Sequence, residues 1–163
     1  MLIRKMKPED VPQAAEIEQE CFSQPWSEKV YHETLENSAS CYLVAETEDN
    51  LQDGGIHKII GTCGFMNVLG EADVSNVAVK KDYRGSGIAY AMMLELIYAG
   101  KMAGVETFFL EVRASNTPAI RTYEKCGFQT KGIRRAFYEQ PPEDALIMRL
   151  ESDQTEKTEI NRI

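Results

Sequence analysis

The sequence of 163 residues contains few of the side chains that bind metals or build disulfide frameworks. It has only two histidines, His32 and His57, and neither has a second ligand at metal-binding spacing. Its four cysteines include no C-x-x-C pair, so neither a zinc site nor a disulfide framework is indicated. We therefore expect no metal, exposed or locally bonded histidines, and four buried thiols at Cys21, Cys41, Cys63 and Cys126.

Long apolar runs are also missing. No stretch approaches the roughly 18 to 20 apolar residues that a membrane span requires, and the N-terminal segment MLIRKMKPED has no apolar signal core. These absences predict a cytoplasmic protein in a reducing compartment that does not contact a membrane.

Basic residues are outnumbered, with 18 Lys and Arg against 26 Asp and Glu and a formal net charge of −8. Affinity for nucleic acid is built from Lys and Arg contacts with phosphates, so this balance argues against direct nucleic-acid binding. An acidic surface favours basic partners, although solubility alone is a sufficient explanation of the charge.

What is present is typical of one globular domain, with 43% hydrophobic and 27% charged residues. A chain of this length buries a sufficient core without disulfides or metals. We expect a single domain at 1–151 and a polar, frayed tail at 152–163, which has no apolar stripe. The oligomeric state is left open.

Residue patterns predict a layered α/β (α+β) fold. Strands that first form a hairpin and then alternate with helices give a mixed sheet, in which a crossover helix joins parallel neighbours. The turn TEDNLQDGG within that hairpin is expected to be mobile. Strands are predicted at 2–6, 41–46, 56–67, 73–80, 107–113, 128–139 and 145–151.

Four helices are predicted from caps and apolar stripes. The first begins at Asp10 with Gln13, and the second at Ser27 with Glu28. The others span 88–103 and 117–126. Apolar stripes are expected from Val11, Ala14, Ile17, Cys21 and Phe22 in the first, and from Val30, Tyr31 and Leu35 in the second.

The segment RGSGIA at 84–89 is the first candidate binding site, because it joins the strand-like VSNVAV to a helix. The first N–H groups of a helix lack internal partners and lie at the positive end of its dipole, so they can hold a pyrophosphate. Gly85 and Gly87 allow the backbone to come close to such a ligand. Taken alone, the pattern fits an ordinary glycine turn equally well.

Segments further along the chain favour the binding interpretation. In order and spacing, the sequence resembles the GCN5-related N-acetyltransferases (GNAT). The resemblance is carried by Val77, Ala78, Val79, the RGSGIA loop, Asn116, Ala119, Ile120, Tyr123, Gly127 and Phe128. Within that family it is similar to the ribosomal protein alanine N-acetyltransferases, through PWSE at 25–28, LEVRASN at 110–116, YEKCGF at 123–128, RRAFYE at 134–139 and EDALIM at 143–148.

The resemblance implies a GNAT fold, with a mixed central sheet that is splayed at the cofactor and flanked by helices, and acetyl-CoA as cosubstrate without a metal. Ala89 stands where glycine is frequent, and Gly85 where a basic residue is common, so one phosphate contact is missing from the pattern. Arg84 compensates for it, unless it is an ordinary solvated arginine. The implied acetyl-CoA contacts are Val77, Ala78, Val79, Arg84, Gly85, Ser86, Gly87, Ile88, Ala89, Tyr90 and Asn116.

Two residues are candidates for catalysis. Strand alternation in FFLEVR places Glu111 on the face opposite Phe108, Leu110 and Val112. From spacing alone, Glu111 is a solvated carboxylate on the strand. Tyr123 lies on a short helix that Asn116 begins and Gly127 ends. This position by itself fits a partly buried core tyrosine. The resemblance implies that Glu111 is the general base and that Tyr123 is the general acid toward the cofactor sulfur.

The acceptor is expected to be a protein N-terminus, that of a basic ribosomal protein. Tyr138 and Arg134 border its groove in the family, although hairpin packing explains them equally well, and Trp26 is assigned to the same groove. Acidic side chains that could attract a basic peptide are Glu33, Glu143 and Asp144, for which a solvated surface is the alternative reading.

Two other functions fit the same motifs. One is acetylation of a lysine or a small-molecule amine, because the cofactor motifs belong to the whole superfamily. The other is a non-catalytic acyl-CoA-binding regulatory module, which the presence of both Glu111 and Tyr123 disfavours.

Overall fold

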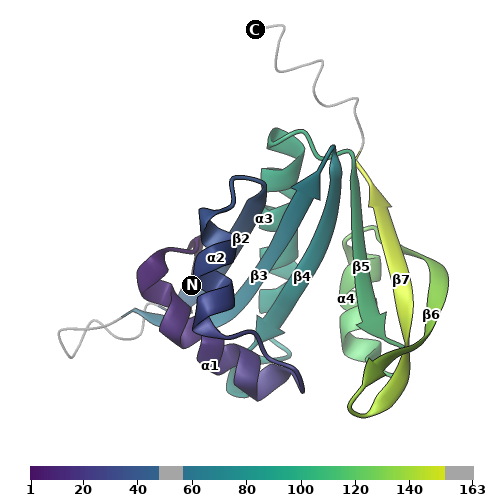
Figure 1. Ribbon diagram of the computed structural model, residues 1–163, viewed down its shortest axis with the longest axis horizontal. Helices are drawn as coiled ribbons and strands as arrows, with labels where there is room; N and C mark the ends of the chain where they lie inside the picture. The colour runs from purple at the N-terminus through teal and green to yellow at the C-terminus, as the bar shows by residue number, and fades with distance from the viewer. Residues whose placement is uncertain (48–56, 153–163) are drawn as a thin grey trace, which may run out of the picture.

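The computed structural model describes residues 1–47 and 57–152, which form a seven-stranded mixed sheet with helices against both faces (Figure 1). The strand order is β1-β2-β3-β4-β5-β7-β6. The strands are β1 (Leu2–Lys5), β2 (Ser40–Thr47), β3 (Lys58–Val68), β4 (Glu71–Val79), β5 (Thr107–Arg113), β6 (Gln129–Glu139) and β7 (Pro142–Glu151). The helices are α1 (Val11–Cys21), α2 (Glu28–Glu36), α3 (Ile88–Met102) and α4 (Thr117–Lys125), with 3-10 turns η1 (Pro8–Asp10) and η2 (Lys81–Tyr83). The predicted layered α/β class is confirmed.

Strand alternation divides the apolar residues between two cores, one on each face of the sheet. Leu43 and Ala45 of β2 pack beneath α3, whereas Tyr42 and Val44 pack on the opposite face with α1 and α2. Figure 1 shows α3 behind the sheet and α1 and α2 in front of it. Strands β2 and β3 are therefore buried on both faces.

The sheet opens between β4 and β5. These strands run parallel and pair over only three positions, from Glu71–Thr107 to Asp73–Phe109. Beyond these positions β4 continues to Val79 and β5 to Arg113, but the two strands no longer pair with each other, and Figure 1 shows them diverging. The predicted crossover helix, α3, connects them. The expected splay of the sheet is confirmed.

Several local predictions are confirmed by individual contacts. Ser27 caps α2 by accepting a hydrogen bond from the Val30 amide, and Asn116 caps α4 through the Ala119 amide. Gly127 follows α4 with φ +98°, the left-handed conformation that favours glycine at a helix end. Phe108, Leu110 and Val112 are buried on one face of β5, as the alternation of FFLEVR predicts.

The predicted stripes of α1 and α2 need correction. Val30 is 36% exposed, so the buried contact of α2 comes from Tyr31, with Leu35 packed at the edge of the core. Phe22 lies beyond the end of α1, where the backbone is extended, and is 38% exposed. Apolar spacing identified these helices but did not fix which residue at the margin of each stripe faces the core.

The prediction of four buried thiols was wrong for three of them. Only Cys63, which lies between the sheet and α3, is buried, while Cys21, Cys41 and Cys126 are partly exposed. Cysteine is small enough to occupy positions at the edge of a core, which sequence position alone does not reveal.

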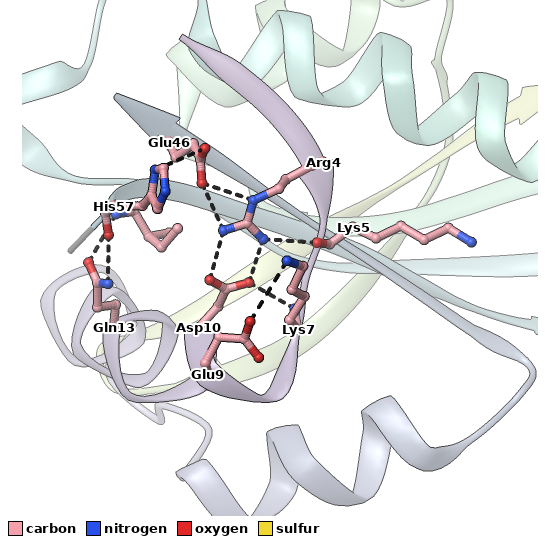
Figure 2. A network of polar contacts seen from close by, with 9 residues as sticks. Arg4, Lys5, Lys7, Glu9, Asp10, Gln13, Glu46 and His57 are labelled. Atoms are coloured by element: carbon pink, nitrogen blue, oxygen red, sulfur yellow. Dashed lines mark hydrogen bonds and ion pairs between the residues drawn. The ribbon is translucent and has the colours of Figure 1, made fainter. Parts of the chain in front are cut away.

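Asp10 occupies the predicted N-cap position of α1, but its side chain makes no capping bond to that helix. Its carboxylate instead accepts hydrogen bonds from Arg4 Nη1, Arg4 Nη2 and the Lys7 amide, at 2.7, 2.9 and 2.8 Å. Arg4 also contacts Glu46 of β2, with 2.7 Å between Nη2 and Oε2, and His57 Nδ1 lies 3.4 Å from Glu46 Oε1 (Figure 2). This network attaches the edge strand β1 to both η1 and β2.

The predicted mobility of the hairpin turn and of the C-terminal tail concerns 48–56 and 153–163, which lie outside the described residues. His32 is exposed, and His57 is exposed with a local contact. Within 1–47 and 57–152, no helix is long and apolar enough to cross a membrane.

Candidate active site

The glycine loop leads directly into α3. Gly85 has φ +78° and Gly87 has φ +81°, conformations that L side chains rarely adopt. A Cβ added at either position would meet no atom within 4 Å, so the backbone conformation, and not crowding, accounts for glycine here. Gly87 is the N-cap of α3 and has no capping side-chain bond. The first amides of α3 are therefore available to a ligand at the positive end of the helix dipole.

β4 contains a bulge beside this loop. Thr62 pairs with Ala78, but Gly64 pairs with Ser75, so β4 has one residue more than β3 between these pairs. Asn76 in the bulge has φ +56°. A bulge leaves its extra residue out of the ladder and redirects the strand. Val77 accordingly lies outside the regular pairing, at the start of the segment 77–79.

These elements border one cleft of about 570 Å³. Its walls are the end of β4, the glycine loop, the first turn of α3, one face of α4 and the end of α1. The structure thus brings together ten of the eleven predicted acetyl-CoA contacts and Tyr123. Those contacts are Val77, Ala78, Val79, Arg84, Gly85, Gly87, Ile88, Ala89, Tyr90 and Asn116.

Two loop side chains have internal partners. Ser86, the one predicted contact outside the lining, donates its hydroxyl to the Tyr83 carbonyl at 2.7 Å. Arg84 borders the cleft, but its Nε donates to the Val79 carbonyl at 3.0 Å and its Nη2 lies 3.2 Å from Cys21 Sγ. Arg84 therefore fixes the loop against β4 as well as contributing positive charge.

Glu111 lies outside the lining of this cleft. It is half-buried on the face of β5 opposite Leu110 and Val112, as predicted. Burial and the nearby charge of Asp73 raise the pKa of the Glu111 carboxyl, while Arg134 opposes that rise. The carboxylate thus stands on the front of the opened sheet, whereas α3 and α4 border the cleft from behind.

Tyr123 is 7% exposed and borders the cleft from α4, with its ring packed against Phe128 at 6.1 Å between centroids. Burial is the main reason that the pKa of the Tyr123 hydroxyl is raised well above its usual range, so the group stays protonated at neutral pH. Within the described chain no group forms a hydrogen bond with this hydroxyl, which leaves its proton free for a ligand.

The three predicted acceptor residues lie apart from the cleft lining. Arg134 Nε is 3.6 Å from Glu111 Oε1, and the Arg113 guanidinium lies 4.2 Å from the centre of the Tyr138 ring. Trp26 packs its ring against Tyr31 and Tyr42 in the front core, at 5.4 and 5.8 Å between centroids. All three stay predictions as acceptor contacts.

The acidic side chains suggested for peptide attraction already have partners. Glu33 lies 3.7 Å from Lys29, and Glu143 accepts hydrogen bonds from the amide and hydroxyl of Ser115. Asp144 accepts from Arg135 and from the Ala136 amide. These contacts organise the β6–β7 hairpin and α2, and the proposed attraction stays a prediction.

Sequence reasoning missed two cations in the cleft, Arg121 and Lys125 of α4. They are four residues apart, so they project from one face of the helix. Lys125 Nζ lies 4.2 Å from the centre of the Tyr90 ring. Helical spacing was the signal available in the sequence, but only the packing of α4 shows that this face borders the cleft. Cys21 and Tyr83 also join the lining.

The cleft fits a long anionic ligand with an apolar arm. Its lining includes the first turn of α3 with its free amides, the cations Arg84, Arg121 and Lys125, and the segment 77–79. Helix N-termini and Arg or Lys side chains are the protein groups that suit pyrophosphate. Among the described residues, no group of His, Cys, Asp or Glu side chains is arranged to hold a metal ion.

Comparison with known proteins identifies the family. The sequence model of the Acetyltransferase (GNAT) family matches residues 11–128. The chain belongs to the GNAT family. GNAT proteins use acetyl-CoA, which agrees with the free amides, the cations and the apolar walls of the cleft.

Curated GNAT relatives match nearly the whole chain. The [ribosomal protein bS18]-alanine N-acetyltransferase of Escherichia coli (strain K12) is 37% identical over 150 residues, which cover 91% of this chain and 95% of the relative. The enzyme of the same name from Haemophilus influenzae is 33% identical over 150 residues, covering 90% and 96%.

A solved GNAT structure gives the same result. The crystal structure of the ribosomal-protein-S18-alanine N-acetyltransferase from Escherichia coli superposes with a TM-score of 0.80 at 33% identity, covering 94% of this chain and 96% of that one. The predicted GNAT fold and an acetyl-CoA-dependent N-acetyltransferase activity are thereby confirmed.

Proposed function

We propose that this protein transfers an acetyl group from acetyl-CoA to the N-terminal alanine amine of a small-subunit ribosomal protein. The observation that carries the proposal is the identity of 33 to 37% with bS18-alanine N-acetyltransferases over at least 90% of the chain. A match of that extent includes the β6–β7 hairpin, which lies outside the cleft lining.

Acetyl-CoA supplies a thioester whose acetyl group is attacked by the amine while the CoA sulfur leaves. In our assignment, the amides at 87–90 hold the pyrophosphate, with Arg84, Arg121 and Lys125 as counter-charges. The backbone of Val77 to Val79 lies along the acetyl and pantetheine arm. N–H donors that face the carbonyl oxygen stabilise the negative charge that develops there.

Glu111 is assigned as the general base for the acceptor amine. An α-amine has a pKa near 8 and a lysine amine near 10.4, so deprotonating the former is easier by roughly 3 to 4 kcal/mol. A half-buried carboxylate with a raised pKa, acting directly or through one water, is adequate for the α-amine. This difference favours a protein N-terminus over a lysine as acceptor.

Tyr123 is assigned as the general acid that protonates the departing sulfur. Two observations support this assignment: the raised pKa keeps its proton in place at neutral pH, and Tyr123 belongs to the cleft lining that we assign to the pantetheine arm. Glu111 and Tyr123 belong to opposite faces of the opened sheet. The acetyl group would therefore pass through the gap between β4 and β5.

The experiment compares two basic peptides that begin with alanine, one with a free N-terminus and one blocked, each containing a lysine. Mass spectrometry locates the acetyl group. We expect labelling of the free N-terminus only. Equal labelling of both peptides would assign the activity to lysine, and acetyl-CoA binding without transfer to either peptide or to a panel of small amines would indicate a binding module.

A further inference from the structure

Glu18 of α1 is buried, with 1% of its surface exposed, and contacts the β4 bulge through Asn76. Its carboxylate accepts three hydrogen bonds. Oε1 accepts from the Tyr31 hydroxyl at 2.9 Å and from Asn76 Nδ2 at 2.7 Å, and Oε2 accepts from the Trp26 amide at 3.1 Å. One side chain thus connects α1, the α1–α2 connection, α2 and β4.

Both the side chain and the main chain of the bulge residue Asn76 are hydrogen-bonded to neighbouring elements. Its side-chain oxygen accepts from the Tyr42 hydroxyl at 3.3 Å, and its main-chain carbonyl accepts from the Thr62 hydroxyl at 3.2 Å. Its φ of +56° is uncommon for a residue other than glycine and costs on the order of 1 kcal/mol. A conformation with this cost persists because the surrounding contacts impose it.

Stability alone is a poor explanation of a carboxylate at this position. Removing a carboxylate from water costs several kcal/mol, and apolar residues of similar volume often replace buried polar groups without loss of stability. Specific geometry is what three directed hydrogen bonds supply. The groups they fix are Trp26, assigned to the acceptor groove, and Asn76, which immediately precedes the proposed acetyl-binding segment 77–79.

We propose that Glu18 is a positioning residue. It holds Trp26 of the acceptor wall and Asn76 of the β4 bulge at a fixed distance and orientation, so that the acceptor amine meets the acetyl group. This inference rests on the proposed acetyl transfer. Glu18 does not border the cleft and contacts neither the glycine loop nor α4. Its effect is therefore on the reacting geometry, and not on the binding of the pyrophosphate.

The first test is Glu18→Gln. Glutamine keeps the shape, but it must direct an N–H toward one of three groups that are themselves donors. We expect kcat to fall at least tenfold, because a displacement of about 1 Å at a reacting centre can cost 100-fold. We expect the acetyl-CoA dissociation constant, measured by calorimetry, to change less than threefold.

The matched control is Glu46→Gln. Glu46 is equally buried, at 5% exposed, and is also hydrogen-bonded, but it contacts Arg4 at the far edge of the sheet. We expect a loss of stability in both variants and a loss of kcat only in Glu18→Gln. Equal kcat values in the two variants, or a fall that matches the unfolded fraction of each, would overturn the proposal.

The second test is Asn76→Gly, which permits the positive φ while removing the bond to Glu18. If both side chains act through this bond, the double variant Glu18→Gln/Asn76→Gly loses no more kcat than the more impaired single variant. Independent, multiplying losses would contradict the assigned linkage.

A third measurement separates this inference from the proposed function. Hydrogen exchange of the Trp26 amide and of the amides at 76–78 requires no acceptor. We expect both regions to exchange faster in Glu18→Gln but not in Glu46→Gln. If wild-type protein leaves the alanine peptide unlabelled, the proposed function fails, and the exchange rates still decide whether Glu18 holds these two regions together.

Discussion

The guanidinium of Arg134 lies beside the carboxylate of Glu111, with 3.6 Å between Arg134 Nε and Glu111 Oε1. Glu111 comes from β5 and Arg134 from β6, two strands of the second half of the sheet that are separated by β7. A residue assigned to the acceptor groove is thus in direct electrostatic contact with the assigned base. This contact links the acceptor surface to the proton transfer.

Replacing Glu111 with glutamine tests its assignment as the base. The amide cannot accept the amine proton, so we expect kcat to fall by 100-fold or more at pH 7. The fall of kcat/KM at acid pH that reports protonation of Glu111 should also disappear. Steady-state kinetics with the alanine peptide measure both effects. Unchanged turnover would remove Glu111 from the chemistry.

Replacing Arg134 with alanine should move the acid limb of the kcat/KM profile to higher pH. Arg134 lowers the pKa of Glu111, so without it the base form requires a higher pH. Arg134 is 56% exposed and therefore screened, which limits the displacement to a few tenths of a pH unit. Arg135→Ala, which removes the partner of Asp144, should leave the limb unmoved. A limb that moves to lower pH would contradict the assignment.

Replacing Tyr123 with phenylalanine should lower kcat by about 100-fold, because the departing sulfur loses its proton donor. In the wild type, burial raises the pKa of Tyr123, so the rate should hold beyond pH 10, the ordinary value for tyrosine. Tyr98→Phe, on the exposed face of α3, is the control. An alkaline decline that persists in Tyr123→Phe would assign that titration to another group.

Removing the cations of α4 should weaken acetyl-CoA binding without affecting chemistry. For Arg121→Ala/Lys125→Ala we expect KM for acetyl-CoA to rise roughly 30-fold, since each of the two charged contacts with phosphate is worth about 1 kcal/mol. We expect kcat to stay within twofold and the difference from wild type to shrink at high salt. Lys131→Ala on β6 should have no effect. An unchanged KM would place the phosphates elsewhere.

Replacing Arg4 with methionine tests the network of Figure 2. Two buried carboxylates, Asp10 and Glu46, would lose their shared partner, which should cost about 3 kcal/mol of unfolding free energy at pH 7. Although burial alone would raise it, hydrogen bonds from Arg4 and Lys7 hold the pKa of Asp10 below its usual range.

The Asp10 pKa also fixes the pH dependence of that loss. A carboxylate with a lowered folded-state pKa stabilises the fold above its unfolded value near 3.9, and this contribution is lost as pH falls through the folded value. The difference between Arg4→Met and wild type in urea unfolding should therefore shrink below about pH 4. Lys7→Met removes an exposed cation and should cost little. An equal loss at pH 7 and at pH 3 would contradict this account.

Local patterns predicted the parts of the site that lie within one segment. The alternation of FFLEVR placed Glu111 opposite the core, because side chains on a strand alternate between faces. The spacing of Gly85 and Gly87 predicted a strand-to-helix turn, and Asn116 and Gly127 predicted the two ends of α4. Backbone conformation and burial period are set by neighbouring residues, so one segment is sufficient to reveal them.

The same reasoning misjudged residues whose partners lie elsewhere in the chain. Asp10 looked like a helix cap, but its carboxylate binds Arg4, which also binds the distant Glu46 in a network that no short window contains. Arg121 and Lys125 were missed, because their role depends on where α4 packs against the cleft.

The sequence by itself determined the layered α/β class, the glycine turn, the caps of α2 and α4 and the face of β5 that carries Glu111. These follow from φ preferences and hydrophobic period, which act over a few residues. Tertiary structure decided that β4 and β5 part after Asp73, that Glu18 reaches Asn76, and that Arg134 lies beside Glu111. Each of these depends on polar or steric contacts between distant segments, whose geometry exists only once both cores have packed.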